Sequence, residues 1–494
     1  MNQERRRIAL VNCPAWGAIP PLGIAALKSF MVSHGYVVKC FDFNLDFYNS
    51  SPQLIKRGFW AADCYNQWTL DYSQTDVRFN RGSHFNTTPL PLKQWAEDIL
   101  SFKPDVVGFS TNLTNMTPGI LLAKELKVLV PGVPMIFGGP NVAQDREGDI
   151  LLKTGVADIV VAKEGEETLL EVMKALENQE DVSSIRGIGL LINGVPTWTP
   201  PRPQIADLDK LPFPDFNDFP LDKYPSPYDI PIMASRGCVY HCAFCYEHIF
   251  WKKFRSRSAE NVVAEMVHRM NEHSLRLPAN KNAKNGNAPP AFVFLFADSL
   301  VNGHFKALEE MCDIIIERGI KLSWTGQATL DKRMTWSFFQ KLKRAGCTGL
   351  AFGLESGSEM VLDGMSKNHN KIKSASNILE YAYKAGMPST VNVMVGFPTE
   401  RFRDFLQTIA FLFKNRKWIY QVSNVTETQL ALGTPLWINP EKWNVTVSQD
   451  GSWTSPNTGT EKDRKRRLKL LHWSMTLLGI PHQRIAEENV VYCD

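Results

Sequence analysis

The sequence predicts two successive α/β domains, a doubly wound parallel sheet and then a partial barrel of six strands, with a small helical region at the C-terminal end. Three observations lead to this prediction. Short apolar runs alternate with segments of helical period through most of the chain, as in strands joined by crossover helices. A proline-crowded stretch interrupts this alternation near residue 200, and the same rhythm then starts again. The 494 residues are enough for about three domains of ordinary size.

The composition is that of an ordinary globular protein. Hydrophobic residues make up 44% and charged residues 21%, and 55 Lys and Arg against 51 Asp and Glu leave a net charge of +4. This balance excludes bulk disorder and gives no reason to expect a nucleic-acid partner. No apolar run reaches the roughly 18 residues that cross a bilayer. The N-terminal MNQERRRIALVNC lacks the apolar core of a secretory signal, so we expect a cytoplasmic protein with no membrane partner.

The first strands and helix are predicted from apolar runs and from the glycine and proline residues that bound them. RIALVN (7–12) predicts a buried strand, and the apolar-periodic stretch 23–34 predicts a helix that Gly35 ends. YVVKCFD (36–42) predicts a second strand, so the chain opens with a right-handed parallel β–α–β unit. Residues 45–95, rich in aromatic residues and Asn, break the rhythm and are interpreted as an insertion.

After the insertion the alternation continues to about residue 177. Strands are predicted at 105–110, 134–139 and 157–162, and helices near 117–128, 147–154 and 166–177. These elements complete a doubly wound sheet over residues 1–185.

Residues 186–230 have a different character. Asn193-Gly194 between apolar runs is a hairpin signal. The segment that follows is crowded with proline, which suits neither a helix nor a central strand. We interpret it as a linker draped over a surface.

A second rhythm predicts the partial barrel over residues 231–430. Its strands are predicted at 232–236, 291–297, 321–327, 348–356, 389–397 and 418–426. Six strands are fewer than the eight of a closed barrel. A helix is predicted from Ser258, with Glu260 in its first turn.

Residues 431–494 form a C-terminal extension. It ends in a predicted helix, EKDRKRRLKLLHWSMTLLG. The basic cluster Arg464–Arg467 in this helix is interpreted as a solvated face, because leucines follow at core-like spacing.

Three of the nine cysteines are clustered directly after the first barrel strand, as Cys238, Cys242 and Cys245 in the pattern CxxxCxxC. In a reducing compartment such a cluster indicates a metal or cofactor rather than a disulfide. Iron–sulfur clusters are normally held by four thiolates. No fourth cysteine lies nearby, because Cys312 and Cys347 fall within later predicted helices. A cubane with three protein ligands has one open iron that can bind a small molecule.

A zinc site is the alternative at these cysteines. His241 or His248 could supply its fourth ligand.

The pattern CxxxCxxC, with the aromatic Phe244 before its last cysteine, resembles the motif of the radical S-adenosylmethionine (SAM) enzymes. The resemblance covers about residues 228–430. It implies that the three cysteines hold a [4Fe–4S] cluster whose open iron binds the amino and carboxylate groups of SAM.

Further landmarks lie at predicted strand ends, where barrel active sites are built. The residues that the resemblance places at SAM are Phe244, Asp298, Ser299, Gln327, Glu355, Ser356, Gly396 and Pro398. Glu355 and Ser356 would meet the ribose or the amino-acid part, and the turn of Gly396 and Pro398 would contact adenine by its backbone. The alternatives are a buried ion pair for Glu355 and a plain turn at 396–398.

The first domain looks like the cobalamin-binding domain that precedes many radical SAM enzymes. The resemblance rests on PPLGIAAL (20–27), GFSTNLTNM (108–116), GGPNVA (138–143) and the EGEET run at 164–168. It implies a Rossmann-like or flavodoxin-like fold. The implied cobalamin contacts are Trp16, Leu22, Gly23, Ser110, Thr111, Leu113, Gly138, Gly139, Pro140, Asn141 and Glu164. Glycines at strand ends are common in any doubly wound sheet, so a domain without cofactor is the alternative.

One departure from that pattern concerns the lower face of cobalt. The motif Asp-x-His-x-x-Gly, which often places a histidine there, is absent, and the only histidines before residue 200 are His34 and His84. We therefore expect Trp16 or another non-histidine side chain below the cobalt. Ordinary packing of Trp16 is the alternative.

Together the resemblances imply a cobalamin-dependent radical SAM enzyme. The favoured activity is transfer of a methyl group from methylcobalamin to an unactivated carbon of a small-molecule or peptide natural product. The alternative is a non-methylating rearrangement, oxidation or cyclisation with the same cofactors. Either activity needs an external electron donor of the flavodoxin or ferredoxin type. The insertion 45–95 and the tail after 436 are expected to select the substrate.

A methylthiotransferase is disfavoured. That activity would need a second cluster, and Cys13, Cys40 and Cys64 lack a shared loop.

Overall fold

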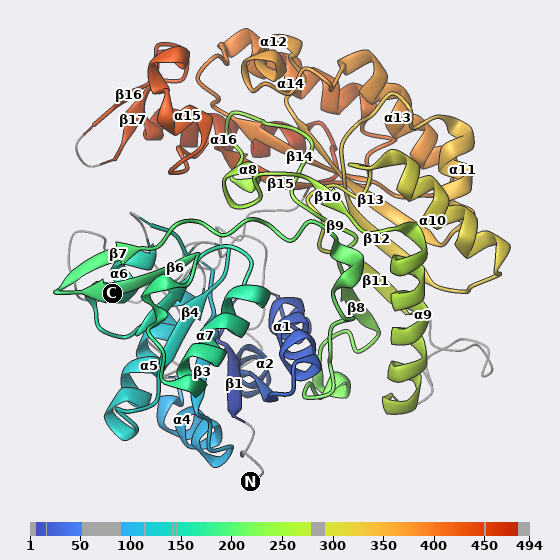
Figure 1. Ribbon diagram of the computed structural model, residues 1–494. Coiled ribbons are helices and arrows are strands. Elements are labelled where there is room, and N and C mark those ends of the chain that lie inside the picture. Colours follow the sequence, from blue (N-terminus) through green and yellow to red (C-terminus); the bar gives the residue numbers. More distant parts are fainter. Residues whose placement is uncertain are drawn as a thin grey trace. The chain divides into compact units, whose positions relative to one another are not determined.

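The computed structural model describes residues 6–15, 17–51, 90–112, 115–140, 142–144, 147–277, 292–448 and 451–482. These residues form two compact units, which divide between Pro227 and Tyr228 (Figure 1). Each unit has its own sheet. No helix in the described ranges has both the length and the apolarity to cross a membrane.

The first unit is built on a seven-stranded sheet in the order β2-β1-β3-β4-β5-β6-β7. Its strands are β1 (Arg7–Asn12), β2 (Val37–Asp42), β3 (Val106–Ser110), β4 (Met135–Gly138), β5 (Ile159–Val161), β6 (Ile188–Ile192) and β7 (Val195–Trp198). The first five are parallel, and β6 and β7 add an antiparallel hairpin beside β5. The strand order 2-1-3-4-5 is that of a flavodoxin-like sheet, which confirms the predicted doubly wound fold.

Helices connect these strands. They are α1 (Leu22–Ser33), α2 (Phe43–Ser50), α4 (Leu92–Ser101), α5 (Met116–Leu129), α6 (Glu147–Lys153) and α7 (Glu166–Asn178). Helices α2 and α4 overlap the ends of the predicted insertion, and residues 52–89 lie outside the described ranges.

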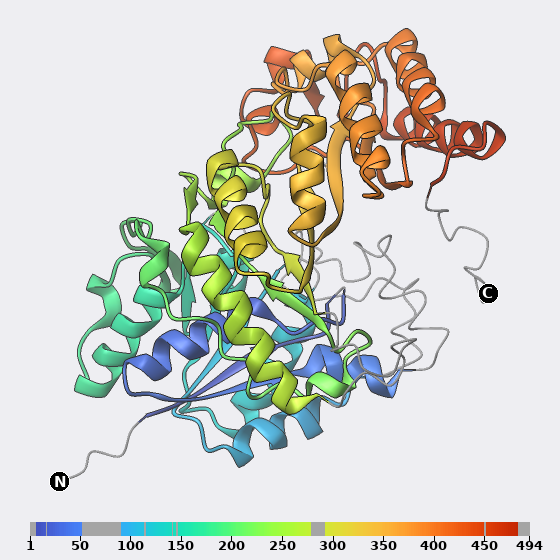
Figure 2. The same ribbon diagram turned by 90° about the vertical axis from the view of Figure 1, so that its right-hand side faces the viewer.

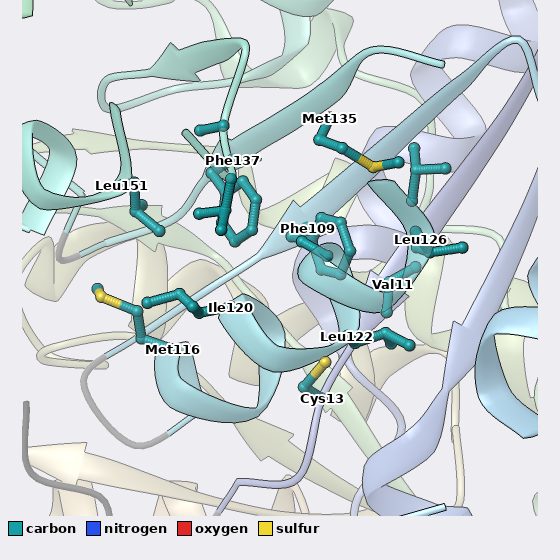
Figure 3. Packing of buried hydrophobic residues seen from close by; sticks show 14 of the residues in the cluster. Val11, Cys13, Phe109, Met116, Ile120, Leu122, Leu126, Met135, Phe137 and Leu151 are labelled. Carbon is teal, nitrogen blue, oxygen red and sulfur yellow. The ribbon is translucent and has the colours of Figure 1, made fainter. Parts of the chain in front are cut away.

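The core of the first unit lies between the sheet and its helices. Phe109 on β3 and Phe137 on β4 stack with their ring centroids 4.6 Å apart, and Met116 and Ile120 of α5 pack in the same cluster (Figure 3). These strands are buried along nearly their whole length. This explains why they are nearly continuous apolar runs in the sequence.

The proline-rich segment after β7 is anchored to the first unit by polar contacts. It contains two 3-10 turns, Leu208–Lys210 and Leu221–Lys223. Lys28 of α1 is buried and pairs with Asp218 at 2.8 Å, and Tyr224 donates a hydrogen bond to Asp42 at 2.5 Å. The segment therefore lies along α1 and the end of β2.

The second unit contains a six-stranded sheet in the order β15-β14-β13-β12-β11-β8, with every neighbouring pair parallel. Its strands are β8 (Asp229–Ile232), β11 (Val293–Phe296), β12 (Ser323–Ala328), β13 (Cys347–Glu355), β14 (Thr390–Val395) and β15 (Gln421–Glu427). Sequential order with parallel pairing confirms the predicted partial barrel.

Two predicted details of this unit are wrong. The first barrel strand ends at Ile232, and Ser235–Arg236 (β9) pairs instead with Arg255–Ser256 (β10) in a separate two-stranded ladder. The chain leaves the sheet early because Ala234 and Ser235 bond to the carboxylate of Asp298. Cys347 begins β13 and does not lie in a helix, since its apolar neighbours belong to the strand.

Helices cover this sheet. They are α8 (Glu247–Phe250), α9 (Ala259–Arg276), α10 (Phe305–Glu317), α11 (Trp336–Arg344), α12 (Glu359–Gly364), α13 (Ile372–Lys384) and α14 (Phe402–Asn415). Helix α9 begins after its predicted cap, Ser258, whose hydroxyl accepts the Asn261 N–H at 3.2 Å. Helices α9, α10, α11, α13 and α14 contact one another in this order along the outside of the sheet (Figure 2).

The C-terminal region contains four short elements and one long helix. They are α15 (Pro435–Ile438), the 3-10 turn Pro440–Trp443, β16 (Thr446–Val447), β17 (Trp453–Thr454) and α16 (Glu461–Leu477). Helix α16 contacts β14 and β15.

The prediction that Arg464–Arg467 is a solvated face is wrong for its first and last residues. Arg464 is buried, with its guanidinium 3.5 Å from the ring centroid of Trp453. Arg467 pairs with the buried carboxylate of Glu400 at 2.9 Å. The guanidinium groups bind Trp453 and Glu400 in the interior, and the aliphatic parts of the two arginine side chains cover apolar surface.

Candidate cofactor sites

The cysteine loop begins where the chain leaves the barrel sheet. Gly237 turns the chain before Cys238 at φ +89°. A Cβ at Gly237 would lie 2.9 Å from the Lys253 carbonyl oxygen, so glycine is required at this turn. All three cysteines of the loop are free; Cys242 is buried, and Cys238 and Cys245 are half-buried.

These thiols are protonated in the metal-free protein. Burial raises the pKa of Cys242 to about 11 and that of Cys245 to about 12, and it also raises the pKa of Cys238. Metal binding must therefore displace protons from them. In the part of the chain that the structure describes, no three His, Cys, Asp or Glu side chains are placed to share one metal ion. A [4Fe–4S] cluster does not need such a shared position, because each thiolate binds its own iron.

The loop is held against α12 and the C-terminal region by backbone bonds. The Ala243 N–H donates to the Met365 carbonyl and the Ala243 carbonyl accepts the Leu436 N–H, both at 2.9 Å. Ala243 and Phe244 also pack in an apolar cluster with Val361 of α12. Phe244 thus anchors the loop that carries the cysteines.

A buried ion pair lies beside the cysteines. Lys367 Nζ is 2.9 Å from Glu355 Oε1, and the two side chains are 10% and 13% exposed. Burial alone would lower the pKa of Lys367, but Glu355, followed by Cys242, raises it, and the net shift is upward. Glu355 has φ +64° where the register of β13 shifts, and its carboxylate meets Lys367. The structure therefore contains the ion pair that was the alternative for Glu355.

Two aromatic rings stack next to this pair. Tyr240, between the first two cysteines, and His369 have ring centroids 3.5 Å apart and planes inclined by 9°. Burial, with the nearby Lys367 ammonium, lowers the pKa of His369 to about 4. The imidazole is therefore neutral at physiological pH.

Asp298 and Ser299 have different partners. Asp298 is buried and accepts the Ala234 N–H at 2.9 Å and the Ser235 hydroxyl. Burial raises its pKa to about 6. Its carboxylate thus fixes the start of the cysteine loop. Ser299 donates to Glu247, two residues after Cys245.

Ser356 and Gln327 end neighbouring strands but face different surroundings. Ser356 is fully buried, with its hydroxyl 3.2 Å from that of Thr408 on α14. Gln327 has an exposed side chain, and its carbonyl accepts the Val301 N–H at 2.8 Å. The structure thus brings Glu355 to the cysteines and turns Ser356 toward the helix layer.

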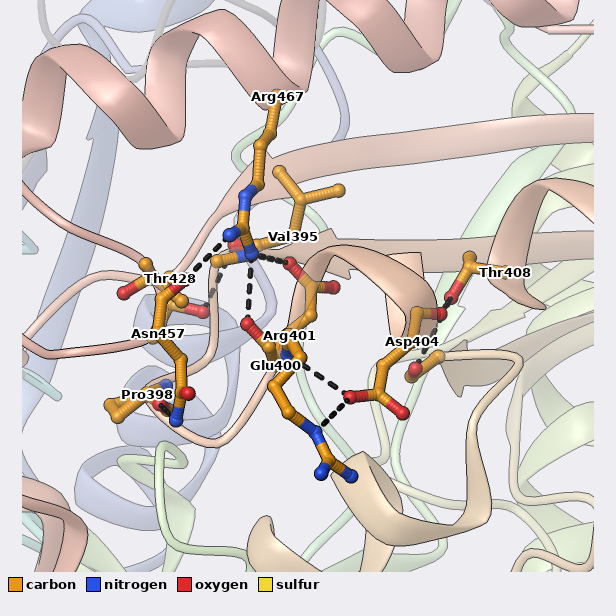
Figure 4. A network of polar contacts seen from close by, with 12 residues as sticks. Val395, Pro398, Glu400, Arg401, Asp404, Thr408, Thr428, Asn457 and Arg467 are labelled. Carbon is orange, nitrogen blue, oxygen red and sulfur yellow. Dashed lines mark hydrogen bonds and ion pairs between the residues drawn. The ribbon is translucent and has the colours of Figure 1, made fainter. Parts of the chain in front are cut away.

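The turn at 396–400 is held by the C-terminal region (Figure 4). The Gly396 N–H donates to Glu400 Oε2 at 2.8 Å, and Arg467 donates to the same oxygen at 2.9 Å. Asn457 donates to the Pro398 carbonyl at 3.0 Å. Burial raises the pKa of Glu400, while Gly396 and Arg467 stabilise its ionised form.

In the first unit, the ends of β3 and β4 form a joint glycine-lined edge. The Thr111 N–H donates to the Gly138 carbonyl at 2.7 Å. Gly139 has φ +131°, and a Cβ there would lie 1.9 Å from the Thr111 carbonyl oxygen. A Cβ at Gly23 would meet the Ser110 hydroxyl at 3.8 Å. The two strand ends thus approach each other so closely that only glycine fits at position 139.

The remaining predicted cobalamin residues are less closely grouped. Glu164 is buried and accepts the Ile205 N–H at 3.0 Å. It therefore binds the proline-rich segment to the chain just before α7. Leu22 begins α1, and Pro140 is exposed after β4. Trp16, Leu113 and Asn141 lie outside the described ranges, as does His84.

A partly buried chain of polar side chains joins the ends of β1, β2 and β3. Asn12 Nδ2 donates to Asp42 Oδ1 at 2.8 Å, and Asn115 Nδ2 donates to Asn12 Oδ1 at 3.3 Å and to the Ser110 carbonyl at 3.1 Å. Burial raises the pKa of Asp42 to about 6. This network is not predicted from the sequence, although Asn12 and Asp42 each end a predicted strand.

The second unit combines a partial six-stranded barrel with a CxxxCxxC loop, and a flavodoxin-like sheet precedes it. This combination is that of radical SAM proteins with an N-terminal Rossmann-like domain. Residues 279–412 match the model of the radical SAM superfamily, and residues 73–173 match the model of the B12 binding domain. The two matches show that a B12-binding domain and a radical SAM domain are combined in this chain, the combination found in cobalamin-binding radical SAM enzymes. Its cofactors are SAM with a [4Fe–4S] cluster, and cobalamin.

Both matches begin partway through their units. The first starts after Cys245 and the second after Gly23. They therefore assign the domains without assigning the individual residues at the cysteine loop or at the start of α1.

Relatives and solved structures agree with these domains. An uncharacterized methyltransferase of Pyrococcus horikoshii is 28% identical over 66% of this chain and 67% of its own length. The anaerobic magnesium-protoporphyrin IX monomethyl ester cyclase of Cereibacter sphaeroides is 28% identical over 60% of this chain and 46% of its own. The radical SAM methyltransferase TsrM of Kitasatospora setae, solved with cobalamin and a [4Fe–4S] cluster, has a TM-score of 0.67 at 15% identity, over 92% of this chain and 82% of its own. That likeness shows a shared fold.

Proposed function

We propose that the protein methylates an unactivated carbon of a small-molecule or peptide natural product. The observation that carries the proposal is the combination of a cysteine loop on a radical SAM barrel with a glycine-lined edge on a B12-binding unit. Methylation is favoured because the names of the Pyrococcus protein and of TsrM identify methyltransferases. When bound, SAM with its cluster supplies hydrogen abstraction and cobalamin supplies a methyl carrier.

In the barrel, Cys238, Cys242 and Cys245 would hold the cluster. The loop is tied to α12 at Ala243, so its cysteines are positioned before metal enters. The buried ammonium of Lys367 would offset the negative charge that thiolates and a carboxylate bring to one place.

The remaining SAM contacts would come from strand ends. Gln327 offers an exposed amide, and the turn at Gly396 and Pro398 is kept rigid by Arg467 and Asn457. The Gly396 N–H is already donated to Glu400. A ligand at this turn would therefore meet carbonyl oxygens, each of which can accept two hydrogen bonds.

In the first unit, the cobalamin tail would pass along Thr111, Gly138 and Gly139, where a side chain on Gly139 has no room. His34 is exposed at the end of α1, where its ring bonds the Phe30 carbonyl at 2.8 Å. It is thus engaged at the far end of the helix from Leu22. This supports a lower cobalt face without imidazole from His34.

The reaction would also need partners beyond its cofactors. One electron for each SAM cleaved would come from an external donor of the flavodoxin or ferredoxin type. We infer a cytoplasmic location, because seven described cysteines are free thiols and a reducing compartment keeps them so. The near-neutral charge balance supports a substrate other than nucleic acid.

A second candidate function is a non-methylating cyclisation or oxidation. The cyclase of Cereibacter sphaeroides favours it, since that protein has the same 28% identity to this chain as the Pyrococcus methyltransferase, although the match covers 46% of its own length against 67%.

The test starts with anaerobic purification and reconstitution with iron, sulfide and cobalamin. The holoprotein is incubated with SAM and dithionite, and 5′-deoxyadenosine and S-adenosylhomocysteine are quantified by mass spectrometry. Formation of both products with stoichiometric cobalamin supports methylation. Deoxyadenosine without S-adenosylhomocysteine would favour the second candidate, and absence of both would contradict either radical activity. The Cys242→Ala variant serves as the inactive control, and Cys312→Ala, buried in α10, as the matched active one.

A further inference from the structure

An open groove of about 930 Å³ lies on the outer helices of the second unit. Helices α12 and α13 and one face of α14 along nearly its whole length form its walls. Four cations line it, Lys373 on α13 and Arg401, Arg403 and Lys414 on or beside α14. Nothing in the proposed SAM or cobalamin sites uses these residues.

The groove is positively charged because its carboxylates are neutralised or few. Asp404 is buried and pairs with Arg401 at 3.1 Å. Glu359 is the other lining carboxylate, and it accepts the Ile372 N–H at 3.2 Å. Lys373, Arg403 and Lys414 are exposed. They therefore create a field that attracts a negatively charged partner.

Large apolar side chains are exposed beside these cations. Met360 on α12 lines the groove and is 39% exposed, and Phe402 and Leu406, on the same turns of α14 as Arg403, are 54% and 47% exposed. Protein interfaces are enriched in Phe, Met and Arg. The surface therefore has the composition of a protein docking site more than that of a small-anion pocket.

One wall of the groove is also the support of the cysteine loop. Met360 faces the groove, while Val361 and Leu362 of the same helix pack with Ala243. The Met365 carbonyl, just after the helix, accepts the Ala243 N–H. An α-helix with its side chains is about 10 Å thick. A partner in the groove would therefore approach the cysteine loop across little more than one helix.

We propose that this groove is the docking surface for a small acidic one-electron carrier protein. The inference rests on the proposed function, which needs such an electron. In each encounter the reduced carrier loses one electron and the cluster gains it, and no bond forms or breaks. Weak redox encounters bury less than about 1,200 Å², which suits a single groove with a few exposed anchors. Opposite charges would speed the encounter and make it sensitive to salt.

The test compares two triple variants of the reconstituted holoprotein. The groove variant is Lys373→Glu, Arg403→Glu and Lys414→Glu. The control variant makes the same charge change at exposed lysines elsewhere on the second unit, Lys306→Glu, Lys321→Glu and Lys384→Glu. SAM cleavage is measured with a reduced acidic flavodoxin as donor and, separately, with dithionite. Binding of the flavodoxin is measured by calorimetry at two salt concentrations.

We expect the groove variant to raise the KM for flavodoxin and its Kd at least tenfold, and to weaken the salt dependence. Dithionite-driven cleavage should remain within twofold of the parent, and the control variant should match the parent in both assays. Unchanged flavodoxin binding in the groove variant would overturn the proposal. So would an equal loss with dithionite, which would show that the groove serves folding or substrate.

Inorganic pyrophosphate tests the small-anion alternative. Micromolar binding that the groove variant abolishes would assign the groove to a small anion and overturn protein docking. If the parent fails to cleave SAM with dithionite, the proposed function fails, and the calorimetric comparison still decides whether an acidic carrier docks here.

Discussion

Lys367 and Glu355 form a buried ion pair at 2.9 Å across the short helix α12, which lies between them in the chain. Glu355 ends β13, and Lys367 follows the helix that supports the cysteine loop. The pair thus joins the end of β13 to the residues that follow α12, and it places one cation beside Cys242. A single contact in this way links the barrel sheet, the cysteine loop and the wall of the outer groove.

Replacing Lys367 by Met should destabilise the metal-free protein. Glu355 would remain buried without its partner, which costs about 3–5 kcal/mol. Chemical denaturation of the cluster-free protein measures the change. The double variant Lys367→Met, Glu355→Gln should recover most of the loss, and Lys367→Arg should lose less. Equal destabilisation of the single and double variants would contradict the pairing.

Each cysteine of the loop should be needed for iron. Replacing Cys238, Cys242 or Cys245 by Ala should reduce bound iron and acid-labile sulfide by tenfold or more, because a cluster with two protein ligands is poorly held. Replacing Cys312, a packed residue of α10, should leave both unchanged. Iron and sulfide analysis after reconstitution measures the effect. If a cysteine variant keeps its full iron content, that cysteine is not a ligand of the cluster.

The turn at 396–400 should depend on the C-terminal helix. In Arg467→Met, Glu400 loses its cation and Gly396 loses the carboxylate that the cation holds in place. Hydrogen exchange at residues 396–400 should rise at least tenfold, while exchange in α9 stays unchanged. Adding Glu400→Gln should restore part of the protection, because a neutral amide can remain buried and still accept the Gly396 N–H. Unchanged exchange would mean that the turn is held by its own backbone.

The sequence predicted the strands well because burial makes each one an apolar run bounded by glycine or proline. The sequence also predicted the cysteine site, since all three cysteines lie within eight residues of one loop. It could not find Lys367, His369 or Arg467, whose functional neighbours are distant in sequence. Only the folded β13–α12 connection brings Lys367 to Cys242, and only the return of α16 to β14 brings Arg467 to Glu400.

The roles of strand-end carboxylates and hydroxyls could not be decided from the sequence. Their types and positions suited a ligand, yet Asp298 is bonded to Ala234 and Ser235, and Ser356 is bonded to the helix layer. A buried polar group must find a partner. Whether that partner is a ligand or the protein itself depends on contacts that a single sequence does not reveal.

The ionisation of Asp42 should reduce stability as pH rises. Its pKa is raised to about 6 in the folded protein, against about 3.9 when unfolded. The folded state therefore binds more protons between these values, and stability falls as pH increases from 4 to 6. The full effect is about 3 kcal/mol. Asp42→Asn lacks this titration, so the difference in unfolding free energy, variant minus parent, should grow by that amount between pH 4 and 7. If the difference in unfolding free energy does not change with pH, the pKa of Asp42 is not raised in the folded protein.

Cobalamin binding should depend on the absence of a side chain at Gly139. In Gly139→Ala, the new Cβ would lie 1.9 Å from the Thr111 carbonyl oxygen at a backbone φ of +131°, so the ends of β3 and β4 must separate. Bound cobalamin, read from its visible spectrum after gel filtration, should fall at least tenfold. Gly155→Ala is the matched control, because it also has positive φ but meets nothing within 4 Å. It should cost about 1 kcal/mol of stability and retain cobalamin. If Gly139→Ala also retains it, the tail of cobalamin does not pass along this edge, and the domain would bind it elsewhere.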